Sequence, residues 1–354
     1  MKHDKKTLVI LSPGFPKDEA DTTCLPSQQI FIRSLNKNFP SLKIIILSFR
    51  YPFSTLTYKW YGNMVIPFNV KKKVLITRIR LWRTLDELKK ENDLIGLFSF
   101  WCGECAFIGK YFGKRNSLKH FTWIMGQDAK KGNRYIKLIR PQSHELIAMS
   151  DFLAKEFYKS YTIHPLHIIP NGIDESLFSK QTTKRNITIL GAGSLIPLKQ
   201  YDVFINVLKE IAEKIPDVAA MLCGKGPQEM ELKKLVVQQQ LQNNIVLIGE
   251  VPHKEILQLM QRTKIFLHTS NYEGFSTVCL EALYAGCHVI SFIKPMHHHI
   301  DHWHIVQTKE EMVKKAIELL ENSATVYTAV MPYAMDDSAK AVIQLFNYKE
   351  AATF

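Results

Sequence analysis

The feature that most limits what this chain can fold into is an alternation of short apolar runs with longer amphipathic segments. Apolar, β-rich runs typical of strands recur along the chain, at residues 7–11, 43–49, 94–100, 120–125, 146–150, 166–170, 187–191, 219–223, 244–249, 265–268 and 288–292. Segments with helical periodicity lie between them, for example at 28–36, 152–158, 201–214, 228–240 and 254–261. Continuous apolar strands that alternate with helices are typical of parallel sheets covered on both faces. The sequence therefore predicts an α/β fold.

This pattern restarts near residue 185. A turn, Pro170-Asn171-Gly172-Ile173-Asp174, and a polar run from Ser179 to Asn186 come just before it, so we place a domain junction at about 172–186. A length of 354 residues also favours two domains. Because open α/β sheets bind ligands beyond the carboxyl ends of their strands, we expect two doubly wound domains with a ligand cleft between them.

Several protein classes are unlike this sequence. It has no uncharged apolar run of about 18 residues, which a membrane-spanning helix needs. The apolar run near the start, 8–11, is short and is followed by the charges of Lys17 and Asp18, so we do not expect a secretory signal. Six cysteines in a chain of this length do not form a disulfide framework. These features predict a cytoplasmic protein with reduced thiols.

The positive charge of the chain is concentrated in its first half. The net charge is +13 overall; residues 1–172 carry 28 basic and 13 acidic side chains, or +15, and the remainder carries −2. An asymmetry of this size favours an anionic partner of the first half, such as lipid headgroups, a phosphorylated acceptor or nucleic acid. The alternative is a basic surface that only keeps the protein soluble. We find no recognisable nucleic-acid-binding module and expect no nucleic-acid partner.

The densest chemical signal lies between Thr269 and Gly286. A strand runs into a polar loop, a helix is expected to begin at Ser276 or Thr277, and Gly286 is placed to end it. Backbone N–H groups at such a helix start are a natural seat for a phosphate. Glu273 and Glu281 bracket this seat, and a carboxylate can accept hydrogen bonds from both hydroxyls of a sugar diol. The alternative is that Glu273 is a solvated loop charge and Glu281 an exposed helix residue.

These residues resemble those of a known family. The Glu-x7-Glu spacing, with Glu-Gly-Phe at the first acid and Leu-Glu-Ala around the second, is similar to the retaining glycosyltransferases of family 4, also called glycosyl transferases group 1. Further matches occur in the same order, at 168–174, 193–199, 223–227 and 248–252. The resemblance covers residues 166–292 well and the first half loosely.

The resemblance implies a GT-B fold, in which two facing Rossmann-like domains enclose a donor cleft. It implies an acceptor-side domain at 1–172, a nucleotide-sugar domain at 173–335, and a tail at 336–354 whose helix packs back on the first domain. The donor would be a UDP- or GDP-sugar, with no cofactor and no catalytic metal. The acceptor would be a saccharide or a lipid-linked molecule, in cell-surface polysaccharide or lipopolysaccharide biosynthesis.

The resemblance also assigns roles to single residues. Glu273 would contact hydroxyls of the donor sugar, Glu281 would hold the ribose diol, and Lys199 would neutralise the diphosphate. The backbone of Gly274, Phe275, Ser276 and Thr277 would supply N–H groups to the phosphates, and Val251 would lie against the base. Asp128 and Gly14 are the candidate contacts from the first half. Ser194, in the segment that resembles the family's phosphate loop, is a further candidate donor contact. The sequence departs from the family at this position, where an arginine is usual, and at Met125, where a histidine is usual.

These departures keep a second function open, a non-catalytic protein that binds a sugar nucleotide or a glycan on the same fold. Under the enzyme interpretation, we expect the basic first half to bind an anionic inner membrane surface peripherally. Segments such as 75–81, which interleave arginines with apolar residues, fit an amphipathic surface segment.

Two further motifs invite other interpretations. Trp101-Cys102-Gly103-Glu104-Cys105 is locally similar to a thioredoxin redox site, but its flanks continue as a larger α/β unit, so we favour core or cleft cysteines. The run from His297 to His299 invites a metal site. Adjacent histidines point in different directions and only Asp301 adds a carboxylate nearby, so we favour a surface or cleft-lining loop.

Overall fold

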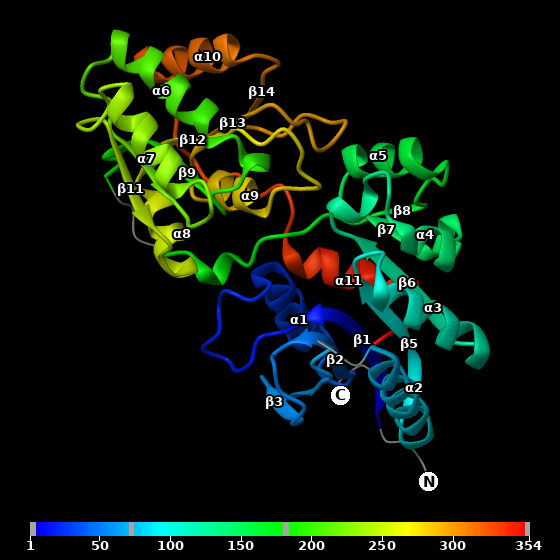
Figure 1. Cartoon of the computed structure of the whole chain (residues 1–354). Coiled ribbons are helices and arrows are strands. Elements are labelled where there is room, and N and C mark those ends of the chain that lie inside the picture. Colours follow the sequence, from blue (N-terminus) through cyan, green and yellow to red (C-terminus); the bar gives the residue numbers. More distant parts are fainter. Residues whose placement is uncertain (1–4, 71–73, 180–183, 351–354) are drawn as a thin grey trace. The chain divides into compact units, whose positions relative to one another are not determined.

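The chain folds into two compact α/β units (Figure 1). The computed structural model describes residues 5–70, 74–179 and 184–350. Unit 1 consists of Met1–Asn171 together with Met335–Phe354, and unit 2 consists of Gly172–Ala334. The α/β fold predicted from the alternation of apolar runs and amphipathic segments is confirmed.

Unit 1 contains an eight-stranded sheet in the order β3-β4-β2-β1-β5-β6-β7-β8. The described strand pairs are parallel, except that β3 and β4 form an antiparallel hairpin. The central strands are almost fully buried, as their unbroken apolar runs predict. The strands are β1 (Lys6–Gly14), β2 (Lys43–Tyr51), β3 (Tyr58–Trp60), β4 (Asn63–Pro67), β5 (Asp93–Phe100), β6 (Lys119–Ile124), β7 (Leu146–Ala148) and β8 (His167–Ile168).

Helices from both ends of the chain complete unit 1. They are α1 (Pro26–Asn38), α2 (Val74–Glu91), α3 (Glu104–Asn116), α4 (Arg134–Ile139), α5 (Asp151–Tyr161) and α11 (Met335–Leu345). The last of these, drawn in red, lies beside blue α1 (Figure 1). Asp336 at its start accepts hydrogen bonds from Ser34 and Lys37 of α1 at 2.6 Å each. The end of the chain is therefore part of the first folding unit.

Unit 2 contains a six-stranded parallel sheet in the order β11-β10-β9-β12-β13-β14. Its strands are β9 (Ile187–Ala192), β10 (Ala220–Cys223), β11 (Ile245–Gly249), β12 (Thr263–His268), β13 (His288–Ser291) and β14 (Trp303–Ile305). Its helices are α6 (Tyr201–Lys214), α7 (Glu229–Gln238), α8 (His253–Gln261), α9 (Thr277–Tyr284) and α10 (Lys309–Glu321). One core cluster joins this sheet to α6, α7 and α10.

The strands that the sequence predicted are confirmed, but three short ones were not anticipated. β3 and β4 form a tight hairpin at one edge of their sheet, and β14 forms an edge of the other. Length alone does not explain this result, because β7, β10 and β13 are equally short and were predicted. Among the helices that the structure describes, none combines the length and the apolar run that spanning a membrane requires.

The topology of unit 2 determines where its candidate residues meet. In a parallel sheet the carboxyl ends of all strands point the same way. They form one edge of the sheet, here meaning the line of strand ends and not an outer strand. Lys199 lies in the connection after β9, Val251 lies after β11, and the loop with Glu273 follows β12. The same edge of the unit 2 sheet therefore carries all three.

Candidate active site

The helix that follows the Glu273 loop begins and ends where the sequence predicts. Ser276 is the N-cap of α9, and Thr277 is its first residue. Gly286 has a φ of 85°, in the left-handed region that commonly terminates a helix. The side chain of Ser276 does not cap the helix, because its hydroxyl lies 3.2 Å from Nε2 of His268.

Glu273 is the centre of a charged cluster. Its Oε2 accepts a hydrogen bond from Lys199 Nζ at 2.5 Å and lies 3.5 Å from Nε2 of buried His268. The hydroxyl of Thr269 donates to the backbone carbonyl of Lys199 at 2.8 Å, which fixes the lysine segment against the loop after β12. The alternative in which Glu273 is merely a solvated loop charge is wrong.

The electrostatics of the cluster favour its charged forms. Burial opposes ionisation of Glu273, but hydrogen bonding to His268 and the charge of Lys199 outweigh it and lower the pKa of the carboxyl to about 2. Burial also opposes the charged form of His268 and would lower its pKa, yet its neighbours Cys279 and Glu273 raise this pKa to about 9. The Glu273 carboxylate is therefore held between the ammonium group of Lys199 and the imidazole of His268.

Glu281 is buried on α9 and has a partner that sequence reasoning did not identify. His253, the first residue of α8, donates from Nε2 to Glu281 Oε1 at 2.7 Å. The side chain of Glu281 is 10% exposed and that of His253 is 22% exposed. The interpretation of Glu281 as an exposed helix residue is wrong. Because α8 follows the carboxyl end of β11, this contact directs the Glu281 carboxylate toward the same sheet edge that carries Lys199.

Two glycine-containing turns pack backbone to backbone beside this edge. Gly193 donates its N–H to Cys223 O at 3.0 Å, and Leu195 donates to Lys225 O at 3.0 Å. A Cβ on Gly224 would lie 1.9 Å from Gly193 O, and one on Gly226 would lie 2.3 Å from Leu195 O. Only glycine permits this approach. Ser194, between these contacts, is exposed.

The loop residues between the two acids are largely buried. Phe275 is buried, stacks on Trp303 with 6.2 Å between ring centroids, and meets Tyr333 edge-on at 5.6 Å. Its side chain therefore anchors the loop, which leaves its backbone as the part that can serve a ligand. Gly274 and Ser276 are also buried, whereas Thr277 is partly exposed. Val251 is partly exposed two residues before His253.

Asp128 and Gly14 lie in unit 1, whereas the other candidate residues lie in unit 2. The Asp128 carboxylate accepts backbone N–H bonds from Cys102 at 2.7 Å, Gly126 at 2.8 Å and Met125 at 3.1 Å. Burial raises the pKa of Asp128, and these bonds counter the rise in part. Gly14 pairs with Tyr51 at the end of β1, where a Cβ would make an ordinary 3.4 Å contact. Packing therefore does not require glycine there.

One pocket of unit 1 lies at the carboxyl ends of β1, β2 and β5 and has a volume of about 320 Å³. Its lining contains two charged side chains, Arg50 of β2 and Glu104 of α3. Aromatic side chains also line it, among them Phe49, Trp101 and Tyr135. Glu104 is held by Arg78 of α2 at 3.0 Å.

The neighbouring cysteines do not have the properties of a redox pair. Cys102 and Cys105 are free and buried. Burial raises the pKa of both thiols well above the ordinary value, so the reactive thiolate is disfavoured. This supports core cysteines, as favoured from the sequence.

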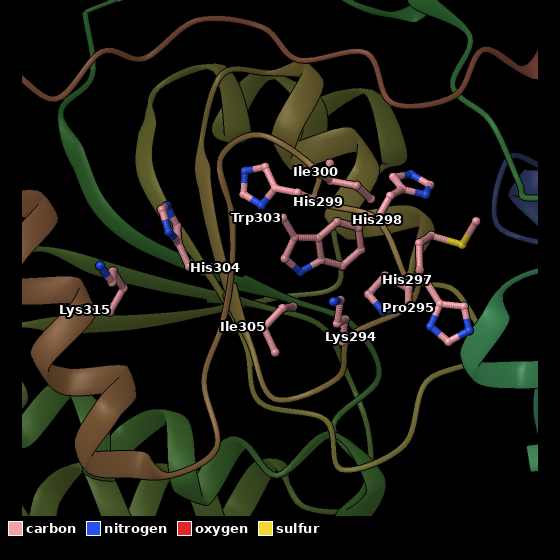
Figure 2. Close-up of a pocket in the computed structure, with 11 residues that line it drawn as sticks. Lys294, Pro295, His297, His298, His299, Ile300, Trp303, His304, Ile305 and Lys315 are labelled. Carbon is pink, nitrogen blue, oxygen red and sulfur yellow. The ribbon is translucent and has the colours of Figure 1, made fainter. Parts of the chain in front are cut away.

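The histidine-rich loop lines a second pocket of about 530 Å³, in unit 2 (Figure 2). The imidazoles of His297, His298 and His299 point in different directions (Figure 2). Burial and neighbouring His288 lower the pKa of His304 to about 4, so this imidazole is neutral at pH 7. Within the described ranges, no group of three histidine, cysteine or acidic side chains is arranged to hold a metal ion.

The two histidines that support the acids were missed because a lone histidine carries no spacing signal. His268 ends the strand before the loop, and His253 follows Val251 by two residues. Their proximity to named motifs is the only signal that could have identified them, and proximity in sequence does not predict a contact 28 residues away.

Comparisons with known proteins agree with this geometry. The family model "Glycosyl transferases group 1" matches residues 173–340. The gpi3 subunit of phosphatidylinositol N-acetylglucosaminyltransferase from Schizosaccharomyces pombe is 26% identical over 203 residues, 55% of this chain and 44% of that protein. A subunit of the human phosphatidylinositol N-acetylglucosaminyltransferase is 30% identical over 126 residues, 35% of this chain and 26% of that protein. This chain therefore spans less than half the length of these relatives.

A solved structure extends the likeness to the first half. Anabaena HepE in complex with UDP-glucose is similar with a TM-score of 0.67 at 16% identity, covering 97% of both chains. Likeness at that identity concerns the fold, which is that of the GT-B glycosyltransferases. Residues 173–340 are therefore similar to the glycosyl transferases group 1 family, and the whole chain has the fold of the solved structure.

Proposed function

We propose that the protein is a retaining glycosyltransferase that moves a sugar from a nucleoside-diphosphate sugar to a saccharide or lipid-linked acceptor. The observation that carries this proposal is the placement of Lys199, Glu273 and Glu281 at one edge of the unit 2 sheet, beside the start of α9. The cation and the helix start can bind a diphosphate, and the two acids can accept hydrogen bonds from the hydroxyls of the sugar and the ribose attached to it.

We propose a UDP-sugar as the donor. HepE was solved with UDP-glucose, and the two relatives described above are N-acetylglucosaminyltransferase subunits. UDP-glucose and UDP-N-acetylglucosamine are therefore the first donors to test.

In the proposed reaction, the bond between the anomeric carbon and the diphosphate breaks while the acceptor oxygen bonds to the same face of the sugar, and the proton of the acceptor hydroxyl passes to the departing diphosphate. Lys199 Nζ and the backbone N–H groups at the start of α9 stabilise the charge that grows on the leaving diphosphate. Glu273 accepts hydrogen bonds from donor-sugar hydroxyls, and Glu281 accepts them from the ribose. We propose that no metal or other cofactor takes part, and that charge neutralisation falls to Lys199.

The pocket at the carboxyl ends of β1, β2 and β5 is the proposed acceptor site. Trp101 and Tyr135 offer aromatic faces, and Arg50 and Glu104 offer hydrogen-bond donors and acceptors, a combination that suits a saccharide. Asp128 organises the adjacent loop through Cys102, so we propose that it acts on the acceptor side by holding this loop.

We further propose that unit 1 binds an anionic membrane surface. Ile76 and Ile79 of α2 are exposed beside exposed Arg80 and Arg83, and unit 1 carries the positive excess of the chain. Co-sedimentation with vesicles tests this: binding should require phosphatidylglycerol and weaken with salt. Equal binding to neutral vesicles would contradict it.

The decisive experiment measures release of the nucleoside diphosphate, UDP or GDP, and product formation from a panel of UDP- and GDP-sugars with candidate acceptors. Transfer with retained anomeric configuration supports the proposal. If a sugar nucleotide binds but is never turned over, the second candidate, a non-catalytic binding protein, replaces the enzyme.

Glu281→Ala should weaken donor binding by about 1–3 kcal/mol through lost charged hydrogen bonds. Unchanged binding by a folded variant would refute the role of Glu281.

A further inference from the structure

The contact between His253 and Glu281 joins two elements that the candidate active site needs. His253 is the first residue of α8, and Glu281 lies in the second half of α9, which packs against α8. Their 2.7 Å hydrogen bond runs from Nε2 to Oε1. Both side chains are mostly buried, so solvent does not easily replace either partner.

This contact offsets part of the free-energy cost of burying the Glu281 carboxylate. Glu281 is 7% exposed as a residue, and a charged group removed from water is costly unless it is paired and hydrogen-bonded. A carboxylate has about four lone-pair positions on two oxygens. His253 occupies one of them, so positions remain for two hydroxyls of a diol.

We propose that His253 is a positioning residue, which fixes the Glu281 carboxylate for the ribose diol of the donor and takes up a proton from solvent when the nucleotide binds. The inference rests on the proposed function, because it assumes that Glu281 holds the donor. His253 lies two residues after Val251, in the segment proposed to lie against the base. It therefore connects the base-binding segment to the ribose-binding acid.

The surroundings of His253 favour its protonated form. The elements packed against α8 are α9, β12 and β9. Their ionisable residues are Cys279, Glu281 and Tyr284 on α9 and Lys264 and His268 on β12, whereas β9 has none. Glu250, Lys254 and Glu255 flank His253 and are exposed. The hydrogen bond to Glu281 raises the pKa of His253 against the opposing effect of burial. A diphosphate bound nearby adds negative charge, which favours the imidazolium further.

The first test is calorimetry of UDP binding in two buffers of different ionisation enthalpy, between pH 7 and pH 9. Net proton uptake should accompany binding to the natural protein and should disappear in His253→Gln. His299→Gln, at an imidazole that is 79% exposed, is the matched control and should behave as the natural protein. Uptake that persists unchanged in His253→Gln would assign the proton to another group, such as His268, and overturn this part of the inference.

The second test uses side chains of different reach. A glutamine amide N–H can occupy the position of imidazole Nε2, whereas asparagine is too short and leucine cannot donate. His253→Gln should therefore bind UDP within about threefold of the natural protein, and His253→Asn and His253→Leu about tenfold or more weakly. The rate at saturating donor should change less than the donor KM, because the contact is to the ribose and not to the reacting atoms.

A purely structural histidine predicts a different order. Leucine would then conserve the packing, and its UDP affinity would match that of glutamine, which would overturn the inference. Melting temperatures identify any variant that fails to fold. If His253→Leu or His253→Asn fails, the UDP affinity of His253→Gln can still be compared with that of the natural protein. Glu281→Gln separates the two proposals: if it leaves UDP binding unchanged, the proposed donor site is wrong. If it weakens binding while His253→Leu does not, only the role of His253 is wrong.

Discussion

Lys199, Glu273 and His268 are understood best as one charged group. Lys199 and His268 both contact the Glu273 carboxylate, and together they lower its pKa. This bears on Ser194, which stands where the resembling family usually has an arginine. Ser194 is exposed and uncharged, but His268, whose pKa Cys279 and Glu273 raise to about 9, is a second basic side chain beside Glu273. Changes to single residues of the cluster should therefore affect both the donor and the fold.

Replacing Lys199 with methionine should slow transfer. The variant keeps the aliphatic stem but removes the cation proposed to stabilise the leaving diphosphate, so kcat should fall on the order of 100-fold or more. The measurement is product formation at saturating donor. Lys209→Met is the control, because Lys209 pairs with Glu213 on the surface of α6. A Lys199→Met rate close to the natural one would show that the leaving group is stabilised elsewhere.

Glu273 should make the stability of unit 2 sensitive to acid. Its pKa is lowered from 4.5 to about 2, so the folded state is stabilised above the unfolded-state pKa and loses this contribution as pH falls from about 4.5 to about 2. At about 1.4 kcal/mol per pKa unit, the contribution is on the order of 3 kcal/mol. Urea unfolding at several pH values should give a shallower acid dependence for Glu273→Gln than for the natural chain. Equal slopes would contradict the depressed pKa.

At the scale of elements, periodicity predicted the strands and helices that carry the site. The strand before the Glu273 loop, the start of α9 near Ser276 and its end near Gly286 were all found as expected. Short edge strands such as β14 were missed because pairing with a neighbour, rather than their own pattern, creates them. The glycine turns after β9 and β10 were recognised as motifs, but their mutual contact was not.

This contact makes Gly226 a sensitive position. In Gly226→Ala, the new Cβ would meet the Leu195 carbonyl oxygen at 2.3 Å, so one of the two turns must move. We expect a loss of about 1–3 kcal/mol in the free energy of unfolding. We also expect weaker UDP binding, because the moved turn continues to Lys199. Gly103→Ala, where a Cβ would meet nothing within 4 Å, is the control for stability. An unchanged melting temperature for Gly226→Ala would show that the turns adjust without strain.

At the scale of the whole molecule, unit 1 is built from two distant segments of the chain. Residues after 335 return to it, where α11 packs on α1 and buries Met335, Ala339, Val342 and Ile343. Phe346 extends this contact, with its ring 5.0 Å from that of Phe121 and close against Gly96. Local periodicity does not indicate this arrangement, because the contacting residues lie more than 200 positions apart, whereas the family resemblance had implied it for the tail at 336–354.

Phe346→Ala should therefore loosen unit 1 and leave unit 2 intact. A buried phenylalanine replaced by alanine costs about 3–5 kcal/mol. Hydrogen exchange should become faster in peptides from α1 and should stay unchanged in peptides from α6, which belongs to unit 2. Phe53→Ala, at a side chain that is 61% exposed, should change neither. Faster exchange in α6 as well would show that the two units unfold together.

The sequence by itself determined the α/β class, the order of the main elements and the identity of the acids around α9. Periodicity and glycine or cap positions are local properties, and they act through backbone geometry that each segment carries alone. The tertiary structure decided which side chains those acids meet: Lys199 for Glu273 and His253 for Glu281. Such pairs form only when the sheet brings the carboxyl ends of separate strands to one edge, and the order of strands in a sheet is a property of the whole fold.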